Sequence, residues 1–161
     1  MSYEVQVNEV QPSPLAVIKG RATHSALSAT ISELFNQVYA ELKKGLVKQD
    51  GQNVVVYWND EGINLLETAG GCPIDIGVQV AAPFKNGGGL KNSTTPGGTV
   101  ATVAHIGPYS DMGKAYDALF EYCRKHGRKL AGPFWEIYGD WEEDSAKLRT
   151  DVYCLLKDGV L

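Results

Sequence analysis

Apolar and polar residues alternate over several short stretches of the chain, as they do in β-strands with one buried face. This alternation predicts strands at 4–10, 15–23, 53–58, 73–82, 98–107, 134–138 and 148–156. Two other segments space their apolar residues as helices do. The first ends at Lys43-Lys44-Gly45 and the second at Arg124-Lys125-His126-Gly127, and basic residues followed by glycine are typical of helix C-termini. The pattern therefore predicts an α+β fold with mostly antiparallel strands.

The two predicted helices have clear apolar stripes. In the first, the stripe consists of Ile31, Leu34, Phe35, Val38, Tyr39 and Leu42, and in the second of Met112, Tyr116, Leu119, Phe120 and Cys123. Ser25 or Ser28 is expected to cap the first helix and Ser110 the second, because hydroxyl side chains accept hydrogen bonds from free backbone N–H groups. Tyr116 lies on its stripe and is therefore expected in the core.

The predicted elements occur twice in the same order, strand–helix–strand–strand. Four pairs of residues support this alignment of the two halves: Gly20 with Gly107, Gly45 with Gly127, Asp60 with Asp140, and Asp75 with Asp151. We interpret the chain as one domain, 1–161, built as a tandem pseudo-twofold duplication. The first half-repeat covers about 1–82 and the second about 99–161, and a central cleft is expected at their junction, where ligand sites are common.

The connector between the halves, about 83–98, is rich in Gly, Asn, Ser, Thr and Pro and is expected to be mostly loop. Its tail, "LKNSTTPGG", is also suited to pair at a sheet edge. The triple glycine 87–89 lacks the Gly-Lys-Ser/Thr ending of a phosphate-binding loop. No nucleotide is therefore expected there.

Composition and charge narrow the class of protein. The chain has 161 residues, is 43% hydrophobic and carries a formal net charge of −4. The acidic balance argues against direct nucleic-acid binding, which normally needs a basic surface. No apolar run approaches the roughly 20 residues that span a bilayer, and the N-terminus has no hydrophobic signal region. We expect a cytoplasmic protein with no membrane contact.

Neither a metal site nor a cofactor is expected. Cys72, Cys123 and Cys154 are far apart and odd in number, which favours free thiols in a reducing compartment. His24, His105 and His126 lack metal-ligand spacing with any cysteine or acid. No Gly-x-Ser-x-Gly motif and no Cys/His pair points to a nucleophile.

The stretch "GPFWEIYGDW" (132–141) carries the candidate binding chemistry. Side chains alternate along a strand, so Phe134, Glu136 and Tyr138 share one face, while Trp135 is on the other and is expected to pack under the second helix. A carboxylate between two aromatic rings suits an aromatic cation, because ring faces attract cations. An apolar surrounding would raise the pKa of Glu136, and a bound cation would restore its charge.

The internal alignment adds further candidates to this cleft. Matching Asp60 with Asp140 places Trp58 opposite Tyr138 and Val56 opposite Glu136. Tyr109 precedes the second helix and is expected near the cleft edge. His105 is a candidate for the cleft as well, although a structural role is the alternative.

Three stretches in order give the chain a family resemblance: "HIGPYSDMGKAYDALFEYCRKHG" (105–127), "GPFWEIYGD" (132–140) and "LRTDVYCLL" (148–156). They resemble the GyrI-like small-molecule-binding domains, also called bacterial transcription activator effector-binding domains. The resemblance covers essentially the whole chain and implies a pseudo-twofold pair of strand–helix–strand–strand units. It also implies that Glu136 occupies the position of the family's cleft carboxylate. Family members often carry a fused DNA-binding helix-turn-helix, for which this chain has no room.

The resemblance leaves three functions open. The first is binding of amphipathic, aromatic, often cationic small molecules by Glu136, Trp58, Tyr138, Phe134, Val56, Tyr109 and His105, for sensing or sequestration. The second is hydrolysis of cyclopropanoid or similar electrophilic genotoxins, with Glu136 as general acid/base and Tyr138 or Tyr109 as hydrogen-bond donor. The third is a protein-interaction module such as a gyrase modulator. The sequence does not separate the first two, because both need the same pocket.

Overall fold

The fold is known from a computed structural model that describes residues 3–157. It contains one eight-stranded antiparallel sheet and two α-helices, in the order β1 (Gln6–Val10), β2 (Pro14–Ala22), α1 (Leu27–Leu42), β3 (Asn53–Tyr57), β4 (Cys72–Gln79), β5 (Lys91–Thr94), β6 (Gly98–Ile106), α2 (Met112–Lys125), β7 (Leu130–Tyr138) and β8 (Arg149–Leu156). The predicted α+β class is confirmed. Residues 158–161, the end of the second predicted half-repeat, lie outside the described range.

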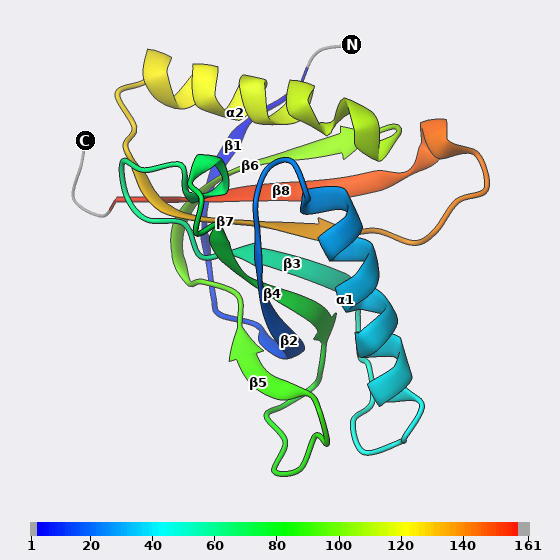
Figure 1. Cartoon of the computed structure of the whole chain (residues 1–161). Coiled ribbons are helices and arrows are strands. Elements are labelled where there is room, and N and C mark those ends of the chain that lie inside the picture. Colours follow the sequence, from blue (N-terminus) through cyan, green and yellow to red (C-terminus); the bar gives the residue numbers. More distant parts are fainter. Residues whose placement is uncertain (1–2, 158–161) are drawn as a thin grey trace.

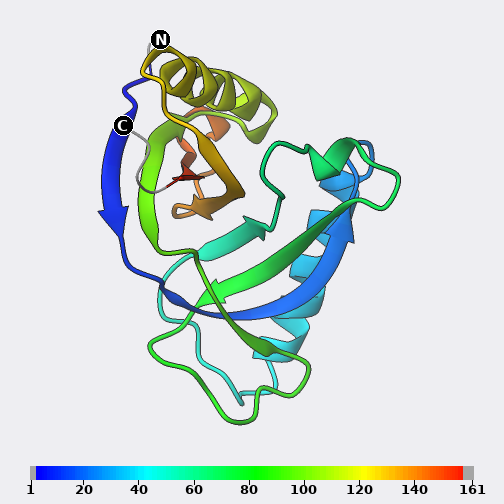
Figure 2. The ribbon, with the colours of Figure 1, turned by 90° about the vertical axis from the view of Figure 1, so that its left-hand side faces the viewer.

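The strands lie in the order β1-β6-β8-β7-β3-β4-β2-β5. The units β2–α1–β3–β4 and β6–α2–β7–β8 therefore share a single sheet, because β3 pairs with β7 at its centre. The edge strand β5 comes from the tail of the connector and pairs with β2, as its composition allowed. Figure 2 shows that the sheet is strongly curved.

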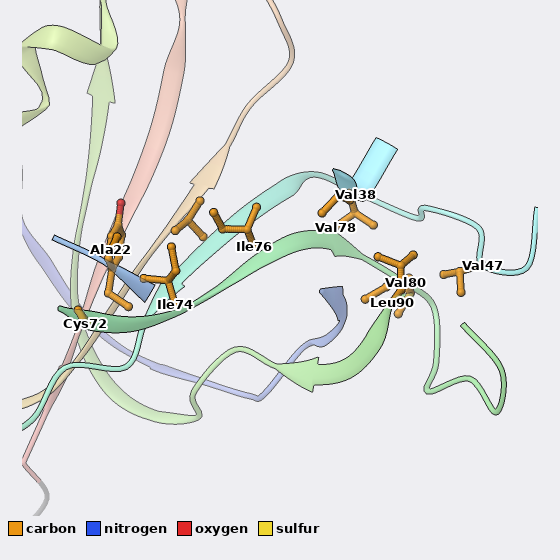
Figure 3. Packing of buried hydrophobic residues seen from close by; sticks show 12 residues of the cluster. Ala22, Val38, Val47, Cys72, Ile74, Ile76, Val78, Val80 and Leu90 are labelled. Carbon is orange, nitrogen blue, oxygen red and sulfur yellow. The ribbon is translucent and has the colours of Figure 1, made fainter. Parts of the chain in front are cut away.

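Both helices pack on the same face of the sheet, one over each unit (Figure 1). Helix α1 covers β2 and β4, and Figure 3 shows the cluster of buried apolar side chains there, of which most are valine or isoleucine. Helix α2 covers β6 and β8. The central strands β3 and β7 lie between the two helices, and this part of the sheet forms the floor of the site described below.

The opposite face of the sheet is closed by its own curvature. Side chains from β2, β3, β6 and β7 meet there in a third cluster, which contains Leu15, Val17, Val54, Val56, Val100 and Trp135. Trp135 stacks on Tyr153 with ring centroids 5.3 Å apart. The prediction that Trp135 packs under the second helix is therefore wrong: both helices lie on the other face of the sheet.

The helix ends follow the sequence signals only in part. Gly45 and Gly127 have φ angles of 78° and 65°, the left-handed conformation that favours glycine after a helix. Neither helix has a side-chain cap: α1 starts after Ala26, and α2 starts after a short 3₁₀ turn over Tyr109–Asp111. The predicted serine caps are wrong. None of the helices in residues 3–157 is long and apolar enough to cross a membrane.

Candidate functional site

The floor of the site is the antiparallel pair β3 and β7. In its register, Tyr57 lies beside Phe134, Val55 beside Glu136, and Asn53 beside Tyr138. Residues paired in this way point to the same face of a sheet. This face is the one that carries the helices, so β7 presents its carboxylate into the space between α1 and α2.

A cavity of about 1620 Å³ lies above this floor. Helix α1 and the loops on either side of β3 line one part of it, and helix α2, the turn before it and β7 line the rest. Its wall is rich in aromatic side chains, namely Phe35, Tyr39, Tyr57, Tyr109, Tyr116, Phe120, Phe134, Tyr138 and Trp141. Concave sites with apolar walls and few polar groups are typical of small-molecule binding.

Glu136 is the buried polar group at the centre of the floor. Its side chain is almost enclosed, at 5% exposure. Three tyrosine hydroxyls donate hydrogen bonds to its carboxylate: Tyr57 at 3.2 Å and Tyr138 at 2.5 Å to Oε1, and Tyr116 to Oε2. The donors come from β3, β7 and α2, so the carboxylate connects both units of the fold.

No cationic side chain among the described residues forms an ion pair with Glu136. Burial raises the pKa of Glu136, while the hydrogen bonds from Tyr116, Tyr138 and Tyr57 act in the opposite direction. Burial, and then the nearby charge of Glu136, hold the pKa values of all three tyrosines well above their ordinary value. The hydroxyls therefore keep their protons and remain donors.

Aromatic rings pack around the carboxylate. Tyr57 and Phe134 stack with ring centroids 4.4 Å apart, and Tyr116 meets Phe134 edge-on at 5.7 Å. Tyr138 makes edge contacts with Tyr109 at 5.6 Å and with Phe35 at 6.2 Å. Each tyrosine that donates to Glu136 is thus held by at least one neighbouring ring, which fixes the direction of its hydroxyl.

Three of the residues proposed from the sequence are not in the cavity, namely Val56, Trp58 and His105. Val56 and Trp58 belong to the cluster on the opposite face, where Val56 lies beside Trp135. The alignment of Asp60 with Asp140 caused this error, because both residues lie beyond the ends of their strands. Side chains alternate with a period of two, so a shift of one residue moves a whole strand to the wrong face.

His105 is also outside the cavity. It is 1% exposed, its Nδ1 is 2.9 Å from the hydroxyl of Tyr3, and its Nε2 is 2.9 Å from the carbonyl oxygen of Pro108. The histidine connects the N-terminal segment to the turn that carries Tyr109. Tyr109 itself lines the cavity and is 48% exposed.

Sequence reasoning missed two of the three donors to Glu136. Tyr57 was passed over for its neighbours Val56 and Trp58, and Tyr116 was assigned to the core because of its helical stripe. The alignment of Asp75 with Asp151 would not have found Tyr57 either, because its offset of 76 residues is even, like the offset of 80 between Asp60 and Asp140. No local sequence pattern indicates that the Tyr116 hydroxyl, on helix α2, contacts Glu136, which lies on β7 20 residues further along the chain.

The charged residues around the cavity are mostly acidic. Asp60 lies beyond the C-terminal end of β3 and Asp140 beyond that of β7, and both line the cavity together with Glu136. Among the described lining residues there is no lysine or arginine, and His24 is the one basic side chain. The electrostatic field in the cavity therefore favours cations.

A buried carboxylate among aromatic rings, in a large cavity between two helices, defines this class of protein as a small-molecule-binding domain. The chain belongs to the family of GyrI-like small molecule binding domains, whose model matches residues 3–157. The family resemblance found in the sequence is thereby confirmed. No curated protein sequence matches the chain.

Solved structures with the same fold are distant in sequence. The C-terminal domain of EcmrR is 19% identical, with a TM-score of 0.75 over 98% of this chain and 99% of that domain. In the EcmrR–DNA complex this chain corresponds to 57% of the EcmrR chain, at 20% identity, a TM-score of 0.77 and 96% coverage of this chain.

Two other structures with this fold come from proteins of different kinds. SAV2435, bound to tetraphenylphosphonium, is 16% identical with a TM-score of 0.67, over 98% of this chain and 95% of that one. A hydrolase from Listeria innocua is 10% identical with a TM-score of 0.59, over 96% of this chain and 92% of that one. At these identities the likeness establishes the fold alone.

Proposed function

We propose that this protein binds amphipathic, aromatic, cationic small molecules in the cavity between the β2–α1–β3–β4 and β6–α2–β7–β8 units. The observation that carries the proposal is the carboxylate of Glu136, which is buried under aromatic rings and has three tyrosine donors but no cationic partner among residues 3–157. If the chain is a duplication of one unit, the two copies meet where β3 pairs with β7, and the cavity lies over this junction.

A delocalised cation suits this arrangement better than a compact one. The oxygens of Glu136 already accept hydrogen bonds from Tyr57, Tyr116 and Tyr138, so a ligand does not have to supply donors. It has to supply positive charge and flat apolar surface, and each aromatic face contributes about 0.5–2 kcal/mol toward a cation. The tetraphenylphosphonium bound to SAV2435 is such a ligand, and it supports this choice of ligand class.

The decisive test compares a cation with a neutral molecule of the same shape. N-alkylquinolinium and 1-alkylnaphthalene differ in charge and hardly in size, and titration calorimetry gives both affinities. In Glu136→Gln, cation affinity is expected to fall by about 1–3 kcal/mol, or five- to 150-fold, the range for losing an interaction with a charged group. The naphthalene affinity is expected to stay nearly constant, because the aromatic wall is unchanged.

A matched control is Glu33→Gln. Glu33 lies on the exposed surface of α1, does not line the cavity, and gives the same change of net charge. Its cation affinity is expected to equal that of the unmodified protein. If Glu136→Gln and Glu33→Gln have the same effect, or if the quinolinium does not bind at all, the proposal is wrong.

A second candidate function is hydrolysis of an electrophilic substrate. It is favoured by the raised pKa of Glu136 and by the Tyr138 hydroxyl 2.5 Å away, an acid and a donor in one cavity. Incubation with cyclopropane electrophiles distinguishes the two functions. Turnover that Glu136→Gln abolishes, with substrate binding intact, supports the hydrolase. Unchanged compound recovered from a tight complex supports the binder.

A further inference from the structure

A second carboxylate in the cavity, that of Asp140, lies just beyond the end of β7, the strand that carries Glu136. Glu136, Tyr138 and Asp140 are separated by two residues each and all line the cavity. The backbone remains paired beyond the end of β7, because the Gly139 N–H donates to the carbonyl of Arg149 at 2.8 Å. At about 3.3 Å per residue, the Cα atoms of Glu136 and Asp140 are roughly 13 Å apart.

Asp140 has capacity for a ligand. One of its oxygens, Oδ1, accepts a hydrogen bond from the Gln52 amide at 3.1 Å. Among residues 3–157, Asp140 takes part in no ion pair. Unlike Glu136, it is exposed to solvent, so it can meet a strongly hydrated group that does not need to be buried.

The floor changes from apolar to polar along β7, from Phe134 past Glu136 toward Asp140. At the Glu136 end, Tyr57 and Phe134 form the stacked pair, whereas Tyr138 lies beside Asn53 at the other end. Asn53 hydrogen-bonds to the hydroxyl of Tyr39 and to the amide of Gln49. The volume of about 1620 Å³ exceeds the roughly 300–1,000 Å³ of ordinary ligand sites.

We propose that the preferred ligands are elongated dications, with an aromatic cationic head over Glu136 and a second, hydrated cationic group at Asp140. This inference rests on the proposed function, because it assumes that the head is held at Glu136. It adds a specificity site: Asp140 selects ligands by length and by the charge at their far end. A compact monocation fills the Glu136 end alone.

The test uses N-(ω-ammonioalkyl)quinolinium ions with a short, a matching and a long linker, around a separation of about 13 Å between the quinolinium nitrogen and the hydrated ammonium nitrogen. An N-alkylquinolinium of equal length with a neutral tip is the monocation control. The matching dication is expected to bind about two- to fivefold more tightly than this control, the range for one exposed ion pair. In Asp140→Asn this advantage is expected to disappear, while the monocation is expected to lose no more affinity than it loses in Asp60→Asn.

The matched variant is Asp60→Asn. Asp60 also lines the cavity, lies beyond the end of β3, and gives the same change of net charge. Because β3 and β7 are antiparallel, it lies toward the opposite end of the floor, behind the Tyr57–Phe134 stack. A general attraction of dications by negative charge would weaken dication binding equally in Asp60→Asn and Asp140→Asn, and this result would overturn the inference.

The outcomes separate this inference from the proposed function. If the monocation binds and depends on Glu136, but the dications gain nothing at any linker length, Asp140 has no such role and the proposed function stands. If neither monocation nor dication depends on Glu136, the proposed function fails. A dication advantage that peaks at the matching linker and is lost only in Asp140→Asn supports the assignment of Asp140.

Discussion

Asp75 and Glu136 are both buried carboxylates on interior strands, at 2% and 5% exposure, yet they lie on opposite faces of the sheet. Asp75 is on the closed face, beside Val56, where the Lys19 ammonium lies 3.1 Å away and the Ser93 hydroxyl 2.5 Å away. Glu136 faces the cavity and has three tyrosine hydroxyls in place of a cation.

The difference shows how a binding site can be told from a structural ion pair. Buried charges are normally paired, because removing a lone charge from water is costly. Asp75 obeys this rule with partners from its own chain. Glu136 obeys only half of it: hydrogen bonds satisfy its oxygens, but no cation among residues 3–157 neutralises its charge. A cationic ligand is the missing partner under our proposal.

The largest expected effect is a difference in stability between variants of the two buried acids. Asp75→Asn removes the charge that Lys19 faces and is expected to lower the free energy of unfolding by about 1–3 kcal/mol. The loss is expected to lie toward the lower end of this range, because Lys19 is half exposed and solvent screens its charge. Glu136→Gln is expected to leave this free energy level or raise it, because it removes an uncompensated buried charge. Urea unfolding of both variants measures the difference, and equal losses would contradict our account of the two acids.

The second effect is the dependence of binding on pH. Burial raises the pKa of Glu136, and a bound cation favours its ionised form. Cation affinity is therefore expected to fall as the pH is lowered through this raised pKa, by at most about tenfold per pH unit. Calorimetry across the acidic range checks this. The neutral naphthalene in the same protein, and the cation in Glu136→Gln, are expected to show no such slope.

The same pKa shift affects folding in the opposite direction. The folded protein keeps the proton of Glu136 in a pH range where the unfolded chain has lost it. The contribution of Glu136 to stability is therefore greatest below the ordinary carboxyl pKa and is lost as the pH rises through the raised value. Glu136→Gln removes this dependence, so the stability curves of the two proteins approach each other at low pH.

The third effect compares two of the three tyrosine donors, Tyr116 and Tyr57, by their influence on the pKa of Glu136. Tyr116→Phe removes a hydrogen bond that helps to hold the pKa of Glu136 down, and Tyr57→Phe removes the longest of the three, at 3.2 Å. Each change is expected to cost about 0.5–1.5 kcal/mol of stability and to move the pH dependence of cation binding upward. The shift is expected to be larger for Tyr116→Phe than for Tyr57→Phe. The reverse order in a pH titration would show that the assignment of the donors is incorrect.

The smallest expected effect concerns the closed face. Trp58 lies in the cluster on the same face as Asp75, not in the cavity. Trp58→Phe is expected to leave cation affinity within about twofold, although it changes the packing of that face. Tyr138→Phe, on the cavity face, is the contrasting variant. A large loss of affinity in Trp58→Phe would show that ligands reach the closed face.

Much of the fold was predictable because alternation and helical spacing are local signals. The two helices, the order of the strands along the chain and the glycines after both helices follow from residues close together in sequence. The place of Glu136 between Phe134 and Tyr138 also follows, because two residues on one strand share a face. These features need no knowledge of which strands are neighbours.

What only the tertiary structure decided is which side chains meet Glu136. The Tyr57 hydroxyl reaches it across 79 positions of the chain, and the Tyr116 hydroxyl reaches it from a helix. The first contact depends on the register of β3 against β7, where a shift of one residue exchanges Tyr57 for Val56 or Trp58. The second depends on how α2 packs over the sheet. The sequence by itself determined the acid and the aromatic residues on its own strand; long-range packing determined its partners, because register and helix docking arise from contacts that no local pattern encodes.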